Sequence, residues 1–219
     1  MTGISQSELP LHTARKVIRG DSEAIADAYG YLAQPIMNLA ARILKDRQLA
    51  EEVLQDTFID LVEKATQIRE PAAIVGWVRR VATNHCLMKL RSPWHARRVT
   101  LDADDGVGAD DLESPALGSD PIALDIIEKG FAELSAETRA VVWLHDVEGY
   151  THREIGELMG KTTSYSKSQL TRGYEKLLAW HRRSHGEHLP GSLDGAESLK
   201  TESKNVEIDT GYIKPTCAS

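Results

Sequence analysis

The spacing of apolar residues constrains this fold more than any other feature of the sequence. Over residues 21–43, 46–62, 74–92 and 125–180, apolar residues recur at three- and four-residue steps. Such spacing puts the apolar side chains on one face of a helix. No segment of any length alternates apolar and polar residues as a half-buried strand would. The sequence therefore predicts an all-α fold.

Capping residues mark the boundaries of the predicted helices. N-cap candidates precede four of them: Asp21 or Ser22, Asp46, Ser135 and Thr151. Thr151 also forms a capping box with Glu154. We expect Gly149 to end the preceding helix as its C′ residue and Gly160 to supply a left-handed turn. Pro35 lies inside the first apolar run and is expected to interrupt or kink it.

The formal net charge is −7, but the acidic residues are unevenly spread. Residues 96–124 hold 2 Lys and Arg against 7 Asp and Glu, and residues 184–219 hold 3 against 6. Both segments are rich in Gly and Ser, a composition typical of disorder. We therefore expect two small helical domains, at 21–95 and 125–183, joined by a flexible acidic linker, with a disordered tail after them. Residues 1–20 show no clear period and form an N-terminal extension.

Three features place the protein in a reducing cytoplasm. No stretch of about 18 apolar residues could span a membrane, and the N-terminus lacks the apolar run of a signal peptide. Cys86 and Cys217 are far apart and in unlike surroundings. A disulfide framework is therefore not expected.

Residues 151–173, THREIGELMGKTTSYSKSQLTRG, fit two helices joined by a tight turn. In a helix-turn-helix, the second helix enters the major groove of DNA. That helix offers six polar or basic residues: Thr163, Ser164, Lys167, Ser168, Thr171 and Arg172. Lys and Arg can contact phosphates or guanine edges, and Ser and Thr can contact either. The alternative is an ordinary helical hairpin with a solvated polar face.

The helix predicted at 74–92 carries a second candidate nucleic-acid face. Four residues share one side of it, and two basic residues flank them: Trp77, Arg80, Asn84 and Arg91, with Arg79 and Lys89. Aromatic, basic and amide side chains together can bind unstacked bases and backbone phosphate. In the alternative interpretation, Trp77 belongs to the core and the arginines extend past it to solvent.

The sequence offers little for catalysis or metal binding. It contains no Gly-rich phosphate loop and no G-x-S-x-G motif, and the paired Asp56 and Asp60 are typical of a solvated helix face. His85 and Cys86 are neighbours, so on a helix their side chains diverge by about 100°. Three histidines at near-ligand spacing lie where the helix is expected to fray: His181, His185 and His188. We therefore expect no enzyme activity, no cofactor and no metal site.

Three segments of the chain, in the order in which they occur, resemble the extracytoplasmic-function class of bacterial sigma-70-type factors. LAEEVLQDTFIDLVEKA is similar to region 2.2 of that family, and IVGWVRRVATNHCLMKLR to regions 2.3 and 2.4. LSAETRAVVWLHDVEGYTHREIGELMGKTTSYSKSQLTRG is similar to region 4. The resemblance covers residues 21–95 and 125–180, with the linker between them.

The resemblance implies a sigma factor, which binds core RNA polymerase and directs it to promoter DNA. Region 2 would engage the −10 element, with Asn84 against a flipped base, and region 4 would read the −35 element as duplex. The implied −10 set is Trp77, Arg79, Arg80, Asn84, Lys89 and Arg91. The implied −35 set is Ser164, Lys167, Ser168, Gln169, Thr171 and Arg172. The implied polymerase-binding set, facing the clamp helices of the β′ subunit, is Glu52, Gln55, Asp56 and Asp60.

The resemblance also implies further contacts with the transcription machinery. Region 4 would sit on the β flap of the polymerase, and the acidic linker would thread the polymerase toward its active-site cleft and RNA exit path. Many members of the family are held inactive by an anti-sigma factor, so such a protein is a further candidate partner.

Three residues depart from the family's helix-turn-helix pattern. Lys161 and Ser166 stand at positions that are usually apolar, and a small rotation of the helix would let Tyr165 fill the gap. Gln169 stands where the family often has a basic residue, which removes one phosphate contact. We therefore expect an altered −35 preference or weaker duplex binding by region 4.

Two other functions stay open at this point. A stand-alone helix-turn-helix regulator with a helical sensor domain would bind duplex DNA without polymerase. A pure interaction protein would hold polymerase but would have lost promoter reading.

Overall fold

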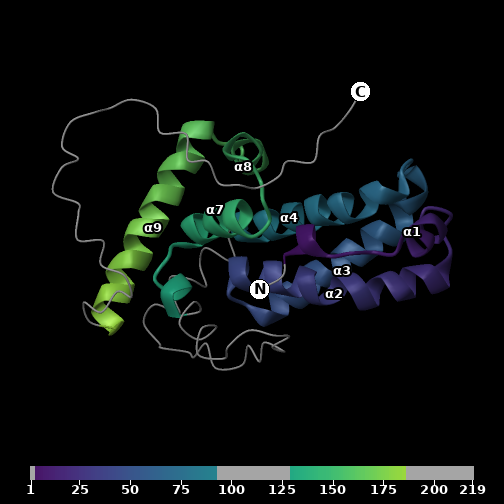
Figure 1. The fold of residues 1–219 in the computed structure, drawn as a ribbon, viewed down its shortest axis with the longest axis horizontal. Coiled ribbons are helices and arrows are strands. Elements are labelled where there is room, and N and C mark those ends of the chain that lie inside the picture. The colour runs from purple at the N-terminus through teal and green to yellow at the C-terminus, as the bar shows by residue number, and fades with distance from the viewer. Residues whose placement is uncertain (1–2, 93–128, 186–219) are drawn as a thin grey trace, which may run out of the picture. The chain divides into compact units, whose positions relative to one another are not determined.

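The computed structural model describes residues 3–92 and 129–185. Within these ranges every regular element is a helix and no strand occurs, as predicted (Figure 1). None of the helices described there is both long and apolar enough to cross a membrane. The predicted linker at 96–124 and the predicted tail beyond residue 185 lie outside the described residues.

Two short helices occupy the first 20 residues, where the sequence showed no period. The 3₁₀ helix η1 spans Ile4–Gln6, and α1 spans Leu11–Val17. A helix of this length is too short for an apolar period to stand out. α1 buries Thr13, Ala14 and Val17 and packs against α2. Packing rather than local propensity therefore accounts for this segment.

α2 spans Ser22–Leu44 and begins as predicted at Asp21, whose side chain caps the first turn. The prediction that Pro35 interrupts this helix is wrong, because α2 runs through it. A proline removes one backbone hydrogen bond from a helix. The apolar residues on its two sides, Leu32 and Ile36, are wholly buried. Burial of that face stabilises the helix across the proline.

α3 spans Arg47–Lys64 and α4 spans Ile74–Arg91, with η2 (Ala65–Gln67) and η3 (Pro71–Ala73) between them. Asp46 caps α3 as predicted, by accepting a hydrogen bond from the backbone N–H of Leu49 at 3.0 Å. α2, α3 and α4 pack against one another (Figure 1). The side chains enclosed between them include Leu39, Val53, Leu61, Val78 and Ala82.

The second helical region consists of α7 (Ala136–Asp146), α8 (His152–Met159) and α9 (Thr163–His185). Ser135 caps α7, and Thr151 with Glu154 forms the predicted capping box at the start of α8. Gly160 has a φ of 64°, so it supplies the left-handed turn between α8 and α9 that the sequence predicted.

The turn between α7 and α8 differs from the prediction. α7 ends at Asp146 with Val147 as its C-cap, so Gly149 is not the C′ residue. Gly149 has a φ of 73° and serves the turn that follows. There the backbone N–H of Tyr150 donates to Leu144 O at 2.9 Å.

The described residues, 3–92 and 129–185, belong to one compact unit, in which α7 packs against α2. The buried guanidinium of Arg139 joins these helices, because its Nε and Nη2 donate to Ile43 O at 3.2 and 2.9 Å. Its Nη1 donates to Leu134 O at 3.1 Å. Burial lowers the pKa of Arg139 to about 10. The two helical regions expected from the sequence are therefore both present and packed together.

Candidate nucleic-acid interface

An exposed face of α9 carries five of the six residues in the predicted −35 set: Ser164, Lys167, Ser168, Thr171 and Arg172. Their three- and four-residue spacing puts them on one side of the helix. The Thr171 hydroxyl donates to Lys167 O at 3.1 Å, within that face. Gln169 differs, because it is half-buried and its side-chain oxygen accepts a hydrogen bond from Thr138 of α7 at 2.7 Å. Gln169 is thus held against α7.

Ser166, rather than Tyr165, occupies the interior of the helix-turn-helix. Ser166 is wholly buried, and its hydroxyl lies 3.1 Å from Nδ1 of His152 at the start of α8. Tyr165 is half-buried, and its hydroxyl donates to Glu137 of α7. The prediction that a rotation brings Tyr165 into the gap is wrong, because His152 satisfies the polar group already there. Lys161, at the other unusual position, is exposed.

The exposed side of α4 carries the amide of Asn84 between two arginines. Arg80, Asn84 and Arg91 are all exposed, and their spacing of four and seven residues puts them on one side of the helix. Trp77 is half-buried and packs against the core. Of the two interpretations of Trp77, the structure favours the one in which it belongs to the core.

Arg79 contacts the turn that follows α7. This turn contains Glu148, a buried carboxylate that the sequence did not indicate. The contact is made by the Arg79 guanidinium. Its Nη1 donates to Glu148 O at 2.7 Å, and its guanidinium lies 4.3 Å from the ring centroid of Tyr150. The side chain of Glu148 is wholly buried and accepts from the backbone N–H groups of Ile4 (3.2 Å) and Ser5 (3.3 Å). Burial raises the pKa of Glu148, and these hydrogen bonds oppose the rise.

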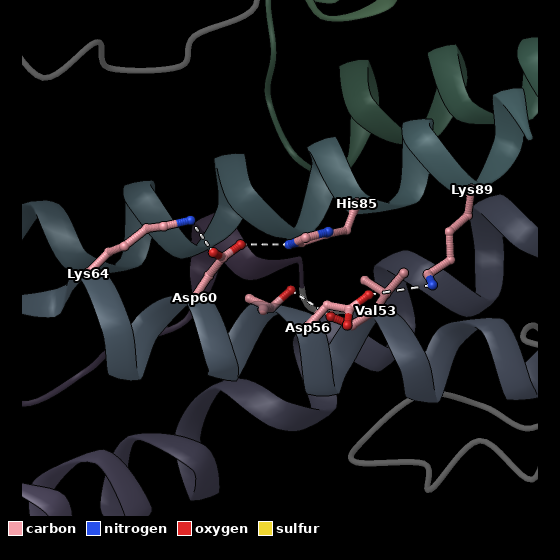
Figure 2. A network of polar contacts seen from close by, with 7 residues as sticks. Val53, Asp56, Asp60, Lys64, His85 and Lys89 are labelled. Atoms are coloured by element: carbon pink, nitrogen blue, oxygen red, sulfur yellow. Dashed lines mark hydrogen bonds and ion pairs between the residues drawn. The ribbon is translucent and has the colours of Figure 1, made fainter.

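Ion pairs between α3 and α4 join residues that the resemblance assigned to different partners (Figure 2). Lys89, from the predicted −10 set, places Nζ 2.7 Å from Glu52 and 3.4 Å from Asp56, both from the polymerase-binding set. Burial alone would lower the pKa of Lys89, but the two carboxylates raise it. Lys89 is therefore a cation with two partners inside the protein.

Asp60 forms a second such contact on the same pair of helices (Figure 2). It accepts a hydrogen bond from Lys64 of α3 and lies 2.8 Å from Nε2 of His85 on α4. The hydrogen bond from Lys64, with a smaller contribution from His85, lowers the pKa of Asp60. The side chain of Asp60 is only 18% exposed, so it belongs to the α3–α4 packing more than to the open surface.

The outer face of α3 exposes apolar residues. Ile59 and Val62 are 56% and 59% exposed, although the apolar spacing over residues 46–62 predicted that Val62 faces the core. Gln55 is exposed as well and shares this side of the helix, since 55, 59 and 62 are four and three residues apart. Of the predicted polymerase-binding set, Gln55 thus lies in line with the exposed apolar residues Ile59 and Val62.

No cluster of three or more potential metal ligands occurs in the part of the chain that the structure describes. Cys86 is wholly buried, and burial raises the pKa of its thiol. The neighbouring His85 is engaged with Asp60. Of the three histidines near the end of α9, His188 lies outside the described residues.

Two family models match the chain in the order of its two helical regions. The model for sigma-70 region 2 matches residues 28–98, and the model for sigma-70, region 4 matches residues 124–177. The chain belongs to the sigma-70 family. Its region 2 includes most of α2 together with α3 and α4, and its region 4 includes α7, α8 and most of α9.

The relatives of the chain are bacterial sigma factors. RNA polymerase sigma factor CarQ of Myxococcus xanthus is 28% identical over 162 residues, which cover 72% of this chain and 89% of CarQ. The ECF RNA polymerase sigma factor SigE of Mycolicibacterium smegmatis is 29% identical over 178 residues, which cover 80% of this chain and 69% of SigE. A solved structure of the sigma factor RpoE with the anti-sigma factor NepR, from Bartonella quintana, matches with a TM-score of 0.48 at 20% identity, over 70% of this chain and 94% of that chain.

The paired regions and these relatives make the chain an alternative sigma factor of the extracytoplasmic-function (ECF) class, which directs transcription. A stand-alone helix-turn-helix regulator is not favoured, because that function leaves region 2 without a role. The resemblance stated from the sequence is thereby confirmed.

Proposed function

We propose that this ECF sigma factor binds core RNA polymerase through α3, engages melted −10 DNA through α4 and reads −35 duplex through α9. The observation that carries the proposal is the pair of exposed polar faces on α4 and α9. Each face lies in the region of the chain, 2 or 4, whose family function requires it.

The face on α9 has the chemistry that duplex reading needs. Ser164, Lys167 and Ser168 lie in the first turns of the helix, the part of a recognition helix that meets base edges. Arg172 lies further along the same side and can pair with a guanine edge or a phosphate. Gln169 is engaged by Thr138, so we assign it to the support of α9 rather than to DNA.

The face on α4 suits an unstacked base. The amide of Asn84 can donate to and accept from the hydrogen-bonding edge of a base outside the stack. Arg80 and Arg91, on either side, can bind the phosphates next to it. Arg79 and Lys89 already have partners within the protein, and we propose that they support α4 rather than make the first contacts.

The exposed face of α3 is the proposed contact with the β′ clamp helices. Gln55, Ile59 and Val62 form a partly apolar stripe of the kind that packs against another helix. Glu52 and Asp56 border this stripe, and their side chains stay 46% and 42% exposed while paired with Lys89. Region 4 is proposed to sit on the β flap.

The remaining parts of the proposal concern the setting in which the protein works. It acts as a non-enzymatic initiation subunit without a cofactor, in the cytoplasm, where the polymerase lies. The residues between regions 2 and 4 are proposed to run toward the active-site cleft of the polymerase. An anti-sigma factor is a candidate partner, because many members of the ECF class are held inactive by one.

A substitution on α9 tests the −35 assignment. Arg172→Ala should reduce −35-dependent transcription by the equivalent of about 1–3 kcal/mol, the usual contribution of a base-edge pair. Binding to core polymerase should not change. Arg182→Ala, on an exposed part of the same helix outside the predicted set, is the matched control. Loss of polymerase binding in the Arg172 variant would contradict the assignment.

A substitution on α4 tests the −10 assignment in the same reconstituted holoenzyme. Asn84→Ala should impair open-complex formation more than closed-complex binding, because a base becomes available to this side chain only once the duplex has melted. Permanganate footprinting of the melted region and filter binding of the closed complex measure the two steps. Equal losses in both would remove the flipped-base role.

A further inference from the structure

The helix-turn-helix of region 4 has a polar link in its interior. Ser166 of α9 is wholly buried at a position that is usually apolar. Its hydroxyl lies 3.1 Å from Nδ1 of His152, the first residue of α8. The imidazole of His152 is half-buried and stacks on that of His145 of α7, with ring centroids 4.6 Å apart and an interplanar angle of 18°.

A second set of contacts connects His145 to α9. Nδ1 of His145 lies 2.7 Å from Oδ1 of Asp146, at the end of α7. The hydroxyl of Tyr174, on α9, donates to both carboxylate oxygens of Asp146, at 2.8 and 3.0 Å. α9 therefore reaches the pair of stacked histidines at two points, directly through Ser166 and through Asp146 from Tyr174.

This arrangement places the imidazole of His152 beside the proposed DNA face. Lys167 directly follows Ser166 and belongs to the exposed set on α9. Any change in how Ser166 is held therefore acts on the position of Lys167. We propose that His152 is a positioning residue for −35 reading: as a neutral imidazole it seats α9 through Ser166, and its protonation loosens α9 and weakens −35 reading as the pH falls.

The charges around His152 support this direction. Burial, then His145 of α7 and Lys167 of α9, lower the pKa of His152, while Asp146 of α7 opposes them. α4 also packs against α8, but its Arg79 acts on Glu154 rather than on His152. A histidine whose pKa is lowered in the folded state binds fewer protons folded than unfolded. The stability that the neutral His152 contributes is therefore fully present above the ordinary pKa of about 6.5, and it falls as the pH drops below that value.

The proposal rests on the proposed reading of −35 DNA by α9, and its test separates the two. His152→Asn keeps a hydrogen-bonding atom near the position of Nδ1 but cannot be protonated in this range. Ser166→Ala removes the partner of the imidazole. His12→Asn, on the exposed side of α1, is the matched control. All variants are made in the full chain.

The first measurement is transcription by the reconstituted holoenzyme, at pH values from about 7.5 to about 6.0. The template is a promoter found by mapping start sites, compared with the same promoter carrying a scrambled −35 element. The ratio of the two transcripts should fall about two- to fourfold for the wild type and the His12 variant, since a histidine with the ordinary pKa of about 6.5 in the loosened state takes up less than one proton over this range. The ratio for His152→Asn should stay nearly constant. Ser166→Ala should lower it already at the higher pH.

The second measurement is urea unfolding of the free full chain over the same pH range, which needs no promoter. The wild type should lose stability relative to His152→Asn as the pH falls. Parallel pH profiles for these two proteins, in unfolding or in transcription, would overturn the proposal. A wild type without −35 dependence at the higher pH would instead contradict the proposed function, and the unfolding profiles would still decide the role of His152.

Discussion

At the scale of single residues, Glu148 shows how a polar group can be buried at low cost. Its Oε1 accepts from Ile4 N and, at 3.4 Å, from Trp143 Nε1, and its Oε2 accepts from Ser5 N. A buried carboxylate without such donors would be strongly destabilising. Here three N–H groups offset much of the desolvation, and together they fasten the N-terminal segment to the turn after α7.

We expect Glu148→Gln to lower the free energy of unfolding by about 1–3 kcal/mol, because the amide nitrogen cannot accept from the N–H groups that face it. The raised pKa of Glu148 means that the folded protein binds more protons than the unfolded chain above the ordinary pKa of 4.5. The stability that wild-type Glu148 contributes should therefore fall as the pH rises above that value. Urea unfolding at several pH values measures this. If the wild type instead became more stable relative to the Gln variant as the pH rose, the raised pKa of Glu148 would be contradicted.

Residues whose role is local could be predicted from the sequence, and residues whose role depends on distant partners could not. Asp46 caps a helix three residues away, so its neighbours in sequence reveal it. Glu148 and Ser166 are buried because Ile4 and His152 reach them from other segments. A polar residue whose partner lies far along the chain looks, in the sequence, like any surface residue.

At the scale of helices, the crossing of α9 over α7 depends on a residue without a side chain. A methyl group added at Gly173 would lie 2.6 Å from Cγ2 of Val142 and 3.2 Å from Cγ2 of Thr138. Val142 is itself buried, so it cannot move aside freely. This close approach sets how α9, with its proposed DNA face, lies on the rest of region 4.

Gly173→Ala should destabilise the protein by about 1–3 kcal/mol, because overpacking at the crossing outweighs the gain of about 1 kcal/mol in helix propensity. Gly30→Ala is the matched control. Gly30 lies on an exposed side of α2 with nothing within 4 Å of an added methyl group, so the same substitution there should stabilise. Denaturant unfolding of both variants measures the difference. Effects of the same sign would contradict the close crossing.

The helices themselves could be largely predicted, because their apolar spacing and caps are written within each segment. The errors lie where packing overrides a local signal. Pro35 does not interrupt α2, because burial of Leu32 and Ile36 stabilises the helix on both sides. α1 forms without a visible period because α2 supplies its packing surface. Val62 faces outward although its spacing fits the core.

At the scale of the whole molecule, the net charge of −7 is a poor guide to the partner. Residues 125–183 hold 9 basic and 9 acidic residues, so region 4 is neutral as a whole. Its proposed DNA face nevertheless exposes Lys167 and Arg172 on one side of α9. Placement of charge on a helix face, rather than its sum, matches what a duplex phosphate backbone requires.

The most direct measurement is in vitro transcription of genomic DNA from the source organism by core polymerase, with and without this protein, followed by sequencing of the RNA 5′ ends. We predict discrete new start sites that share −35 and −10 elements upstream, because both exposed faces contribute to promoter choice. Protein that binds core polymerase but yields no new start sites would contradict the claim that α4 and α9 read promoters together.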